Sequence, residues 1–196
     1  NIRDFCGSNL LKLKIEMIKS LNQVDEIIVN SDSDEMLQIG LDCGVNTHKR
    51  EDYYASSECT NSEYHEYLGK SVNSEDILIA QVTAPLISKE TFEKCIDIYF
   101  NSDCDSLMTV QSIKSHLWLD NKPLNYEVGS APNSQDLPNI LKLTFGVVLC
   151  KRDSLIKRRN MVGFKPYFYE LDKIESIDID TEFDFKVAEY FYREKM

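Results

Sequence analysis

The chain has 196 residues, of which 42% are hydrophobic, and it carries a formal net charge of -11 at pH 7. This length and apolar content suffice for one substantial core, so we expect a single domain over residues 1–196. The acidic balance excludes a surface that binds nucleic acid through general electrostatics. Since no apolar run approaches the roughly 20 residues of a membrane span and the first residues lack a signal-peptide pattern, we expect a cytoplasmic protein without a membrane partner.

The cysteines and histidines give no sign of a metal site. The six cysteines are scattered without a CxxC pair, and the three histidines show no metal-ligand spacing with them. We therefore interpret the cysteines as free thiols in a reducing compartment.

The first part of the chain alternates between helix and strand patterns. Residues 9–23 form an amphipathic pattern with Ser8 or Asn9 as the cap, which predicts a helix. A short buried strand is expected over residues 27–29, and a second helix over residues 34–43. This order is typical of an α/β sheet.

The same alternation continues after a loop. Thr60 and Glu63 are spaced as in a capping box and predict a short helix that Gly69 closes. Residues 77–80 form the near-continuous apolar run of a strand covered on both faces. Ser88 predicts the start of another helix, and SLMTVQS predicts a further strand.

Residues 112–138 interrupt this pattern. They hold three of the five prolines and a turn-like DNKP between LWL and LNY, which predicts a hairpin and loop outside the main sheet. The stretch LTFGVVLC then returns to the sheet, RDSLIKRRN predicts a short basic helix, and KPYFYEL predicts a late strand packed in the core.

The stretch SIDIDTEFDF, residues 176–185, places two aspartates before a predicted helix. Because side chains alternate along an extended chain, Asp178 and Asp180 should share one face of a strand, opposite Ile177 and Ile179. Two carboxylates at a strand end favour Mg²⁺. The alternative is that the second aspartate caps the helix.

The helix after these aspartates is expected to bury one apolar stripe. Its members recur at the helical period, and they are Phe183, Val187, Ala188 and Phe191.

Polar residues follow several predicted strands. Ligands of open α/β sheets bind at the carboxyl ends of the strands. We therefore expect Asn30 to Asp32, Gln81 with Thr83, and the aspartate pair to face one cleft.

Taken together, four stretches give a family resemblance. VDEIIVNSDSDEM, IAQVTAPL, NSQDLP and SIDIDTEFDFKVAEYF resemble, in this order and spacing, the acylneuraminate cytidylyltransferases. The resemblance implies a Rossmann-like three-layer α/β/α sandwich of the nucleotide-diphospho-sugar transferase type, with a mostly parallel sheet. It also implies a homodimer in which residues 112–138 reach the second subunit.

The reaction of that family joins CTP to a sialic-acid-like sugar acid, with release of pyrophosphate and formation of a CMP-sugar. The resemblance implies that Asp178 and Asp180 hold the catalytic Mg²⁺ (or Mn²⁺). It implies nucleotide contacts from Asn1, Arg50 and Ala80. It implies sugar-acid contacts from Gln81, Thr83, Lys142 and Phe164.

Several positions depart from the family pattern. The basic, Gly/Ser-rich loop that grips the CTP phosphates would lie before Asn1, so we expect the natural protein to have a further N-terminal segment. Ser134 and Lys142 stand where the family commonly has arginine, and Phe145 stands where it has asparagine. These changes keep two alternatives open, namely a different acceptor such as an eight-carbon ulosonic acid, or a non-catalytic nucleotide-binding module.

Overall fold

The computed structural model describes residues 1–195. Its helices are α1 (Leu10–Lys19), α2 (Asp34–Asp42), α3 (Asn61–Ser71), α4 (Lys89–Asn101) and α5 (Glu182–Lys195). Its strands are β1 (Asp4–Phe5), β2 (Ser8–Asn9), β3 (Ile28–Ser31), β4 (Asn46–Lys49), β5 (Asp76–Ala80), β6 (Ser106–Ile113), β7 (Trp118–Leu119), β8 (Lys122–Pro123), β9 (Ile140–Lys151) and β10 (Pro166–Glu170). Short helical turns are η1 (Asp52–Ala55), η2 (Ser134–Asp136) and η3 (Ser154–Arg158).

The helices begin where the capping residues predict. The side chain of Asn9 accepts a hydrogen bond from the backbone of α1, and Ser88 does the same for α4. Thr60 and Glu63 form a complete capping box at the start of α3. Each of these side chains satisfies a backbone N–H that has no partner within its own helix.

The main sheet has four strands in the order β10-β6-β9-β5. Strand β10 is parallel to β6, whereas β9 is antiparallel to both β6 and β5. Three strands therefore share one direction, and β9 makes the sheet mixed rather than fully parallel. The reversal arises because the chain leaves β6, forms the excursion and returns directly beside β6 as β9.

Helices cover both faces of this sheet, which gives the predicted three layers. Phe92 and Cys95 of α4 pack with Leu107 and Leu149 in one buried cluster. The neighbouring strand residues, which point to the opposite face, pack beneath α3 and η3 in another cluster. The buried members of this second cluster, from the strands and from the segments that cover them, are Leu68, Met108, Val148, Cys150, Leu155 and Met161.

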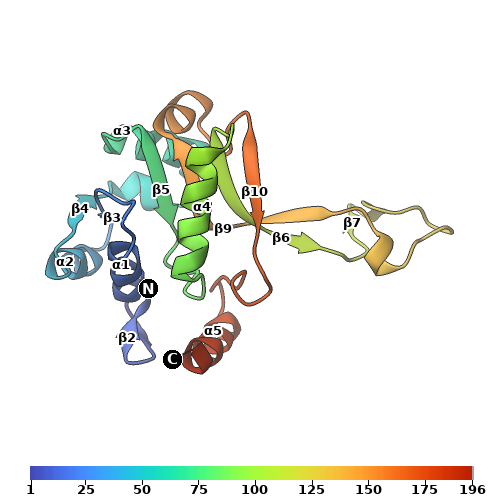
Figure 1. Ribbon diagram of the computed structural model, residues 1–196, viewed down its shortest axis with the longest axis horizontal. Coiled ribbons are helices and arrows are strands. Elements are labelled where there is room, and N and C mark those ends of the chain that lie inside the picture. The colour runs from blue at the N-terminus through green and yellow to red at the C-terminus, as the bar shows by residue number, and fades with distance from the viewer. Residues whose placement is uncertain (196) are drawn as a thin grey trace.

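A second, smaller sheet pairs β3 with β4 in parallel and lies beside α1 and α2 (Figure 1). It shares no strand pairing with β5 among the described residues, so β3 and β5 each have one unpaired edge. A cavity of about 950 Å³ lies between them, lined along β3 and along β5. The body of the molecule is thus open between its two sheets.

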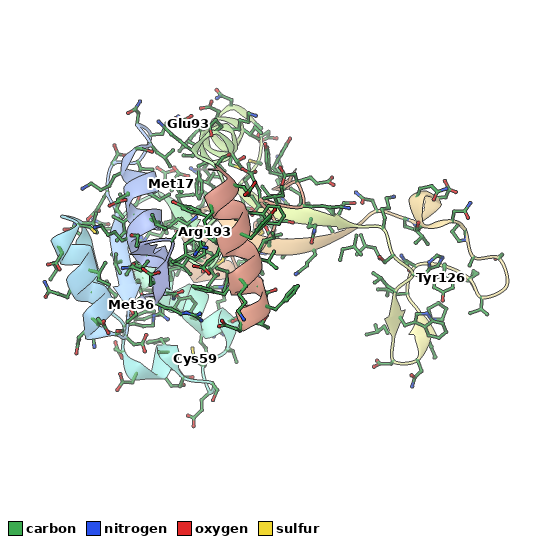
Figure 2. The ribbon with its side chains drawn as sticks, turned by 90° about the horizontal axis from the view of Figure 1, so that it is seen from below. Met17, Met36, Cys59, Glu93, Tyr126 and Arg193 are labelled. Atoms are coloured by element: carbon green, nitrogen blue, oxygen red, sulfur yellow. The ribbon has the colours of Figure 1, made fainter. Side chains whose placement is uncertain are left out.

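The excursion projects from the body as an arm, which we define as residues 112–138 (Figure 1). Its β7–β8 hairpin turns at Asp120 and Asn121, whose φ angles of 48° and 61° are those of a two-residue hairpin turn. Figure 2 shows Tyr126 of the arm far from Arg193 of α5 and Met17 of α1. The predicted hairpin outside the main sheet is confirmed.

Two core predictions near the C-terminus are wrong for some of their residues. Tyr167 and Phe168 of β10, an outer strand of its sheet, are each 41% exposed, whereas Tyr169 and Leu171 pack in the core as predicted. Phe183 is 73% exposed and Phe185 is buried in its place, whereas Ala188 and Phe191 pack in the cluster around Phe5 as predicted. The packing of the chain's first residues decides which face of α5 turns inward.

Two smaller predictions can be compared directly. All six cysteines are free thiols, as expected. No helix within residues 1–195 is long and apolar enough to cross a membrane.

Candidate functional site

The cavity between β3 and β5 collects most of the predicted nucleotide and sugar residues. Asn1, Arg50, Ala80, Gln81 and Thr83 all line it. They come from the chain start, the end of β4, and the end of β5 with its following loop. The predicted polar residues at the ends of β3 and β5 thus line one cavity, whereas Asp178 and Asp180, which were predicted to face the same cleft, do not line it.

Arg50 is fixed at the end of the small sheet. Its backbone N–H donates to the carbonyl of Ser31, which extends the β3–β4 ladder by one residue. Its Nε donates to Oδ1 of Asn30 at 2.8 Å, and its Nη2 donates to the Asn30 carbonyl at 2.9 Å. The guanidinium also lies over the ring of Tyr64, 4.9 Å from the ring centroid.

The loop after β5 joins the cavity to the SIDID segment. The N–H of Gln81 donates to the carbonyl of Gly146 at 3.4 Å, which continues the pairing of β5 with β9. The carbonyl of Thr83 accepts from the N–H of Ile179 at 2.9 Å. The residue between the two aspartates is therefore bound to a residue that lines the cavity.

The SIDID segment is not a strand, contrary to prediction. Ser176 lies in a turn, and residues 177–180 pair with no strand, because no strand edge runs in register beside them. The predicted alternation still holds for the isoleucines, since Ile177 and Ile179 pack in one apolar cluster. Asp178 is half-buried and Asp180 is exposed.

Asp178 carries the most informative atom of the site. Its Oδ1 is buried and has no hydrogen-bond partner. A buried carboxylate oxygen without a partner is costly, and buried charges in proteins are normally paired or coordinate a metal. The Asp178 carboxylate therefore fits a position for a cation.

The alternative role for Asp180, a helix cap, is wrong. Oγ1 of Thr181 accepts from the N–H of Asp184, and Oδ2 of Asp184 accepts from the N–H of Thr181 at 2.8 Å. These two side chains form the reciprocal cap of α5. The Asp184 pKa is lowered, first by its bond from the Thr181 side chain. The Asp180 carboxylate makes no hydrogen bond to another residue in 1–195.

The two aspartates fit an open Mg²⁺ site rather than a closed one. Within residues 1–195, no group of three or more His, Cys, Asp or Glu side chains could hold a metal by itself. Mg²⁺ is usually bound through one or two carboxylates, completed by water and substrate phosphates. Asp178 and Asp180 supply that number of protein ligands.

Lys142 lies near the start of α5, which follows the two aspartates. It is an exposed residue of β9, paired in register with Gln111. Its positive charge is among the causes that lower the Asp184 pKa, after the hydrogen bonds of the α5 cap. Lys142 is therefore close to the helix that follows the two aspartates.

Phe164 is not brought to this site within one chain. It is 79% exposed, and the guanidinium of Arg158 lies over its ring at 4.2 Å. Its backbone N–H donates to Asp105, which directly precedes β6, whereas Lys142 pairs near the far end of that strand. A role for Phe164 in the sugar site of a second subunit stays a prediction.

Sequence reasoning missed Tyr64 and His48, which line the cavity, and the ring contacts around them. Tyr64 stacks under Arg50, while Nε2 of His48 lies 2.7 Å from the hydroxyl oxygen of Tyr67. Tyr54 stacks on Tyr67 with ring centroids 3.8 Å apart. The spacing of Tyr64 and Tyr67 on one helix was a usable signal, but the sequence does not say what that face meets.

No protein-family profile matches the chain. Individual proteins do match over nearly its whole length. Post-translational flagellin modification protein B of Campylobacter coli is 23% identical over 100% of this chain and 88% of its own length. N-acylneuraminate cytidylyltransferase A of Danio rerio is 22% identical over 96% of this chain. The chain resembles the acylneuraminate cytidylyltransferases. The family resemblance drawn from the four stretches is confirmed.

Coverage differs among the cytidylyltransferase relatives. CMP-N,N'-diacetyllegionaminic acid synthase of Campylobacter jejuni is 22% identical over 97% of this chain and 86% of its own length. The chain spans only 46% of the Danio rerio protein. The shared region is thus most of the two Campylobacter proteins and less than half of the Danio rerio one.

Solved structures agree on the fold. The 4-diphosphocytidyl-2C-methyl-D-erythritol synthase of Anaerococcus prevotii matches with a TM-score of 0.72 at 16% identity, covering 97% of this chain and 88% of its own. A CMP:2-keto-3-deoxy-manno-octonic acid synthetase complexed with CTP matches with a TM-score of 0.70 at 12% identity, covering 100% and 92%. The predicted Rossmann-like α/β fold is confirmed.

Proposed function

We propose that this protein is a cytidylyltransferase that transfers CMP from CTP to the anomeric hydroxyl of a sialic-acid-like sugar acid. The observation that carries the proposal is the buried, unpartnered Oδ1 of Asp178. It belongs to a segment hydrogen-bonded to Thr83, and Thr83 lines the cavity that also holds Arg50. The relatives named for CMP-sugar synthesis support the same reaction class.

In the proposed reaction the anomeric oxygen forms a bond to the α-phosphorus of CTP, the bond to the pyrophosphate oxygen breaks, and the hydroxyl proton is lost. Asp178 and Asp180 would hold Mg²⁺ (or Mn²⁺), which neutralises phosphate charge and orients the attacking hydroxyl when bound. Arg50 presents its guanidinium to the base. Lys142 supplies a positive charge for the carboxylate of the sugar acid.

We also propose that the natural protein places one more strand between β3 and β5. Both strands offer an unpaired edge to the same cavity of about 950 Å³. Unpaired backbone groups facing a cavity are a template for strand addition. The family pattern would make this the strand that carries the phosphate-binding loop, and hydrogen exchange of the β3 and β5 amides in the natural full-length protein tests it.

A homodimer belongs to the proposal. The arm exposes four large apolar side chains, which are Trp118, Leu119, Leu124 and Val128. Their exposed fractions lie between 53% and 72%. Apolar surface on a projecting hairpin indicates a protein interface, and a second copy of this chain would also bring its Phe164 toward a neighbouring site. Sedimentation of the wild type against Trp118→Ser with Leu119→Ser measures this association.

A second candidate function is the same transfer to an eight-carbon ulosonic acid. Ser134 lies exposed in η2 of the arm and Lys142 at the arm's base. Neither side chain binds a carboxylate through the two parallel hydrogen bonds that arginine forms. The acceptor pocket therefore differs from one built around arginine.

The test is pyrophosphate release from CTP and Mg²⁺ by the natural full-length protein with a panel of nine-carbon and eight-carbon sugar acids. We expect release with one acceptor and its loss in Asp178→Asn and Asp180→Asn. Asp184→Asn is the matched control, because that carboxylate caps α5. Full activity in either of the first two variants would remove the metal assignment. Absence of CTP binding would favour a non-catalytic module.

A further inference from the structure

Arg50 is a half-buried cation without an acidic partner. The chain has 33 acidic and 22 basic residues, and the neighbouring Lys49 forms an ion pair with Asp34 at 2.6 Å. The Arg50 guanidinium instead donates hydrogen bonds only to oxygens of Asn30 among the described residues. A guanidinium has five N–H donors, so three remain free. They belong to a side chain that lines the cavity.

Asn30 fixes the edge of this guanidinium. It belongs to β3, in register with His48 of β4, and its side-chain and main-chain oxygens each accept one N–H of Arg50. The Arg50 backbone is tied to the same strand through Ser31. Strand β3 thus binds both the backbone and the guanidinium of Arg50.

The ring of Tyr64 contacts the flat face of the Arg50 guanidinium. Its ring centroid is 4.9 Å from Cζ of Arg50, within the range of a cation–π contact. Burial raises the Tyr64 pKa, so the ring stays a neutral phenol at physiological pH. The Tyr64 hydroxyl makes no hydrogen bond to another residue in 1–195, so Tyr64 contacts Arg50 through its ring face. The capping box of Thr60 and Glu63 anchors the first turn of α3, where Tyr64 lies.

We propose that Asn30 and Tyr64 are positioning residues that hold Arg50 as a rigid reader of the pyrimidine base. The inference rests on the proposed function. Cytosine presents two adjacent acceptors, O2 and N3, whereas uracil presents a donor at N3. A guanidinium with only N–H donors suits the first edge and leaves the N3–H of uracil unpaired. Because Arg50 cannot swing away, the clamp favours CTP over UTP.

The experiment compares binding of CTP and of UTP, with Mg²⁺, by calorimetry on the natural full-length protein. Tyr64→Leu removes the ring face, and Tyr64→Phe is the matched control that keeps it. We expect Tyr64→Leu to weaken CTP binding about 5- to 30-fold, the range of a partly desolvated cation–π contact, with UTP binding little changed. Tyr64→Phe should stay within about twofold of wild type for both ligands.

Asn30→Ala releases the other side of the guanidinium and should lower the CTP-to-UTP preference in the same direction. If Tyr64→Leu does not fold, the CTP-to-UTP preference of Asn30→Ala tests the proposed positioning of Arg50 by itself. An unchanged preference in both variants, in a wild type that selects CTP and releases pyrophosphate, overturns the clamp and leaves the proposed function intact. Equal weakening for both nucleotides shows a merely structural role and also overturns it. A wild type without preference for CTP overturns both proposals.

Discussion

Strands β6 and β9 run through two different environments. One part of the pair is buried in the core of this chain, and the other part is exposed where the strands lead into the arm. At one end Leu107, Val147 and Leu149 are almost fully buried beneath α4. At the other end Leu141 and Phe145 are each 38% exposed, and the strands continue into the arm. The β6–β9 pair is therefore buried in the core over one part of its length and partly exposed to solvent over the rest.

The change of environment falls at an irregularity in the ladder. The β6–β9 register shifts between Met108 and Val110, and Phe145 has φ of 54°. Gly146 lies against Ile87, where an added Cβ would come within 2.3 Å of Cδ1. A bulge of this kind bends a strand and raises its twist, which turns the arm out of the sheet.

The largest expected difference between the two environments comes from removing one aromatic ring at each. Phe92→Ala empties a fully buried position and should lower the free energy of unfolding by about 3 to 5 kcal/mol. Trp118→Ala, on the arm, should change it by less than about 0.5 kcal/mol. Urea unfolding at low protein concentration measures both. Similar losses in the two variants would contradict the contrast.

Lys14 tests the core through pH. Burial lowers its pKa to about 7 in the folded protein, against an ordinary value of 10.5, while its Nζ donates to the Ala84 carbonyl at 2.9 Å. Below pH 7 both states bind the proton; between pH 7 and 10.5 the folded state releases it first, so stability rises with pH in that window. Above it the cost is gone.

Lys14→Met should therefore raise the free energy of unfolding near pH 7 and remove about 3 kcal/mol of the rise between pH 7 and pH 10. The measurement is urea unfolding of wild type and variant at several pH values. Lys12→Met is the control, because Lys12 is exposed on the same helix. Parallel pH profiles for wild type and Lys14→Met would show that burial does not hold this lysine neutral.

Thr109 tests the junction between core and arm. Its buried hydroxyl accepts from the Val147 N–H at 3.0 Å and bonds to the Thr144 hydroxyl at 2.9 Å. Thr109→Val leaves that backbone N–H without its partner and should cost about 1 to 3 kcal/mol. Thr144→Val keeps the bond to Val147 and should cost less. The order of the two unfolding midpoints is the result to check, and the reverse order would contradict it.

A small stabilising effect is expected at Phe145, where a non-glycine residue lies at φ of 54°. Asparagine tolerates this conformation better than phenylalanine. Because Phe145 is 38% exposed, the packing lost on replacement offsets only part of this gain. Phe145→Asn should raise the free energy of unfolding by about 0.5 to 1 kcal/mol, measured as a shift in melting temperature. A clear loss would show that the exposed ring contributes to folding.

Much of the fold was predictable because its signals are local. Asn9, Thr60 and Ser88 cap helices as expected, and the apolar run before Gln81 is a strand. The wrong predictions concern contacts between distant segments. Phe183 fits a helical stripe equally well as Phe185, and only the position of Phe5 decides between them. The strand expected at Ile177 to Asp180 fails because a strand needs a partner edge, which its own residues do not supply.

The site shows the same division. The sequence alone determined which residue types gather after β3 and β5, and that two aspartates precede the last helix, since these depend on spacing along the chain. Only the tertiary structure decided that Asp178 buries an oxygen without a partner, that Thr181 and Asp184 cap α5, and that Tyr64 lies under Arg50. Burial and side-chain contact are properties of several elements packed together, so no single stretch of sequence encodes them.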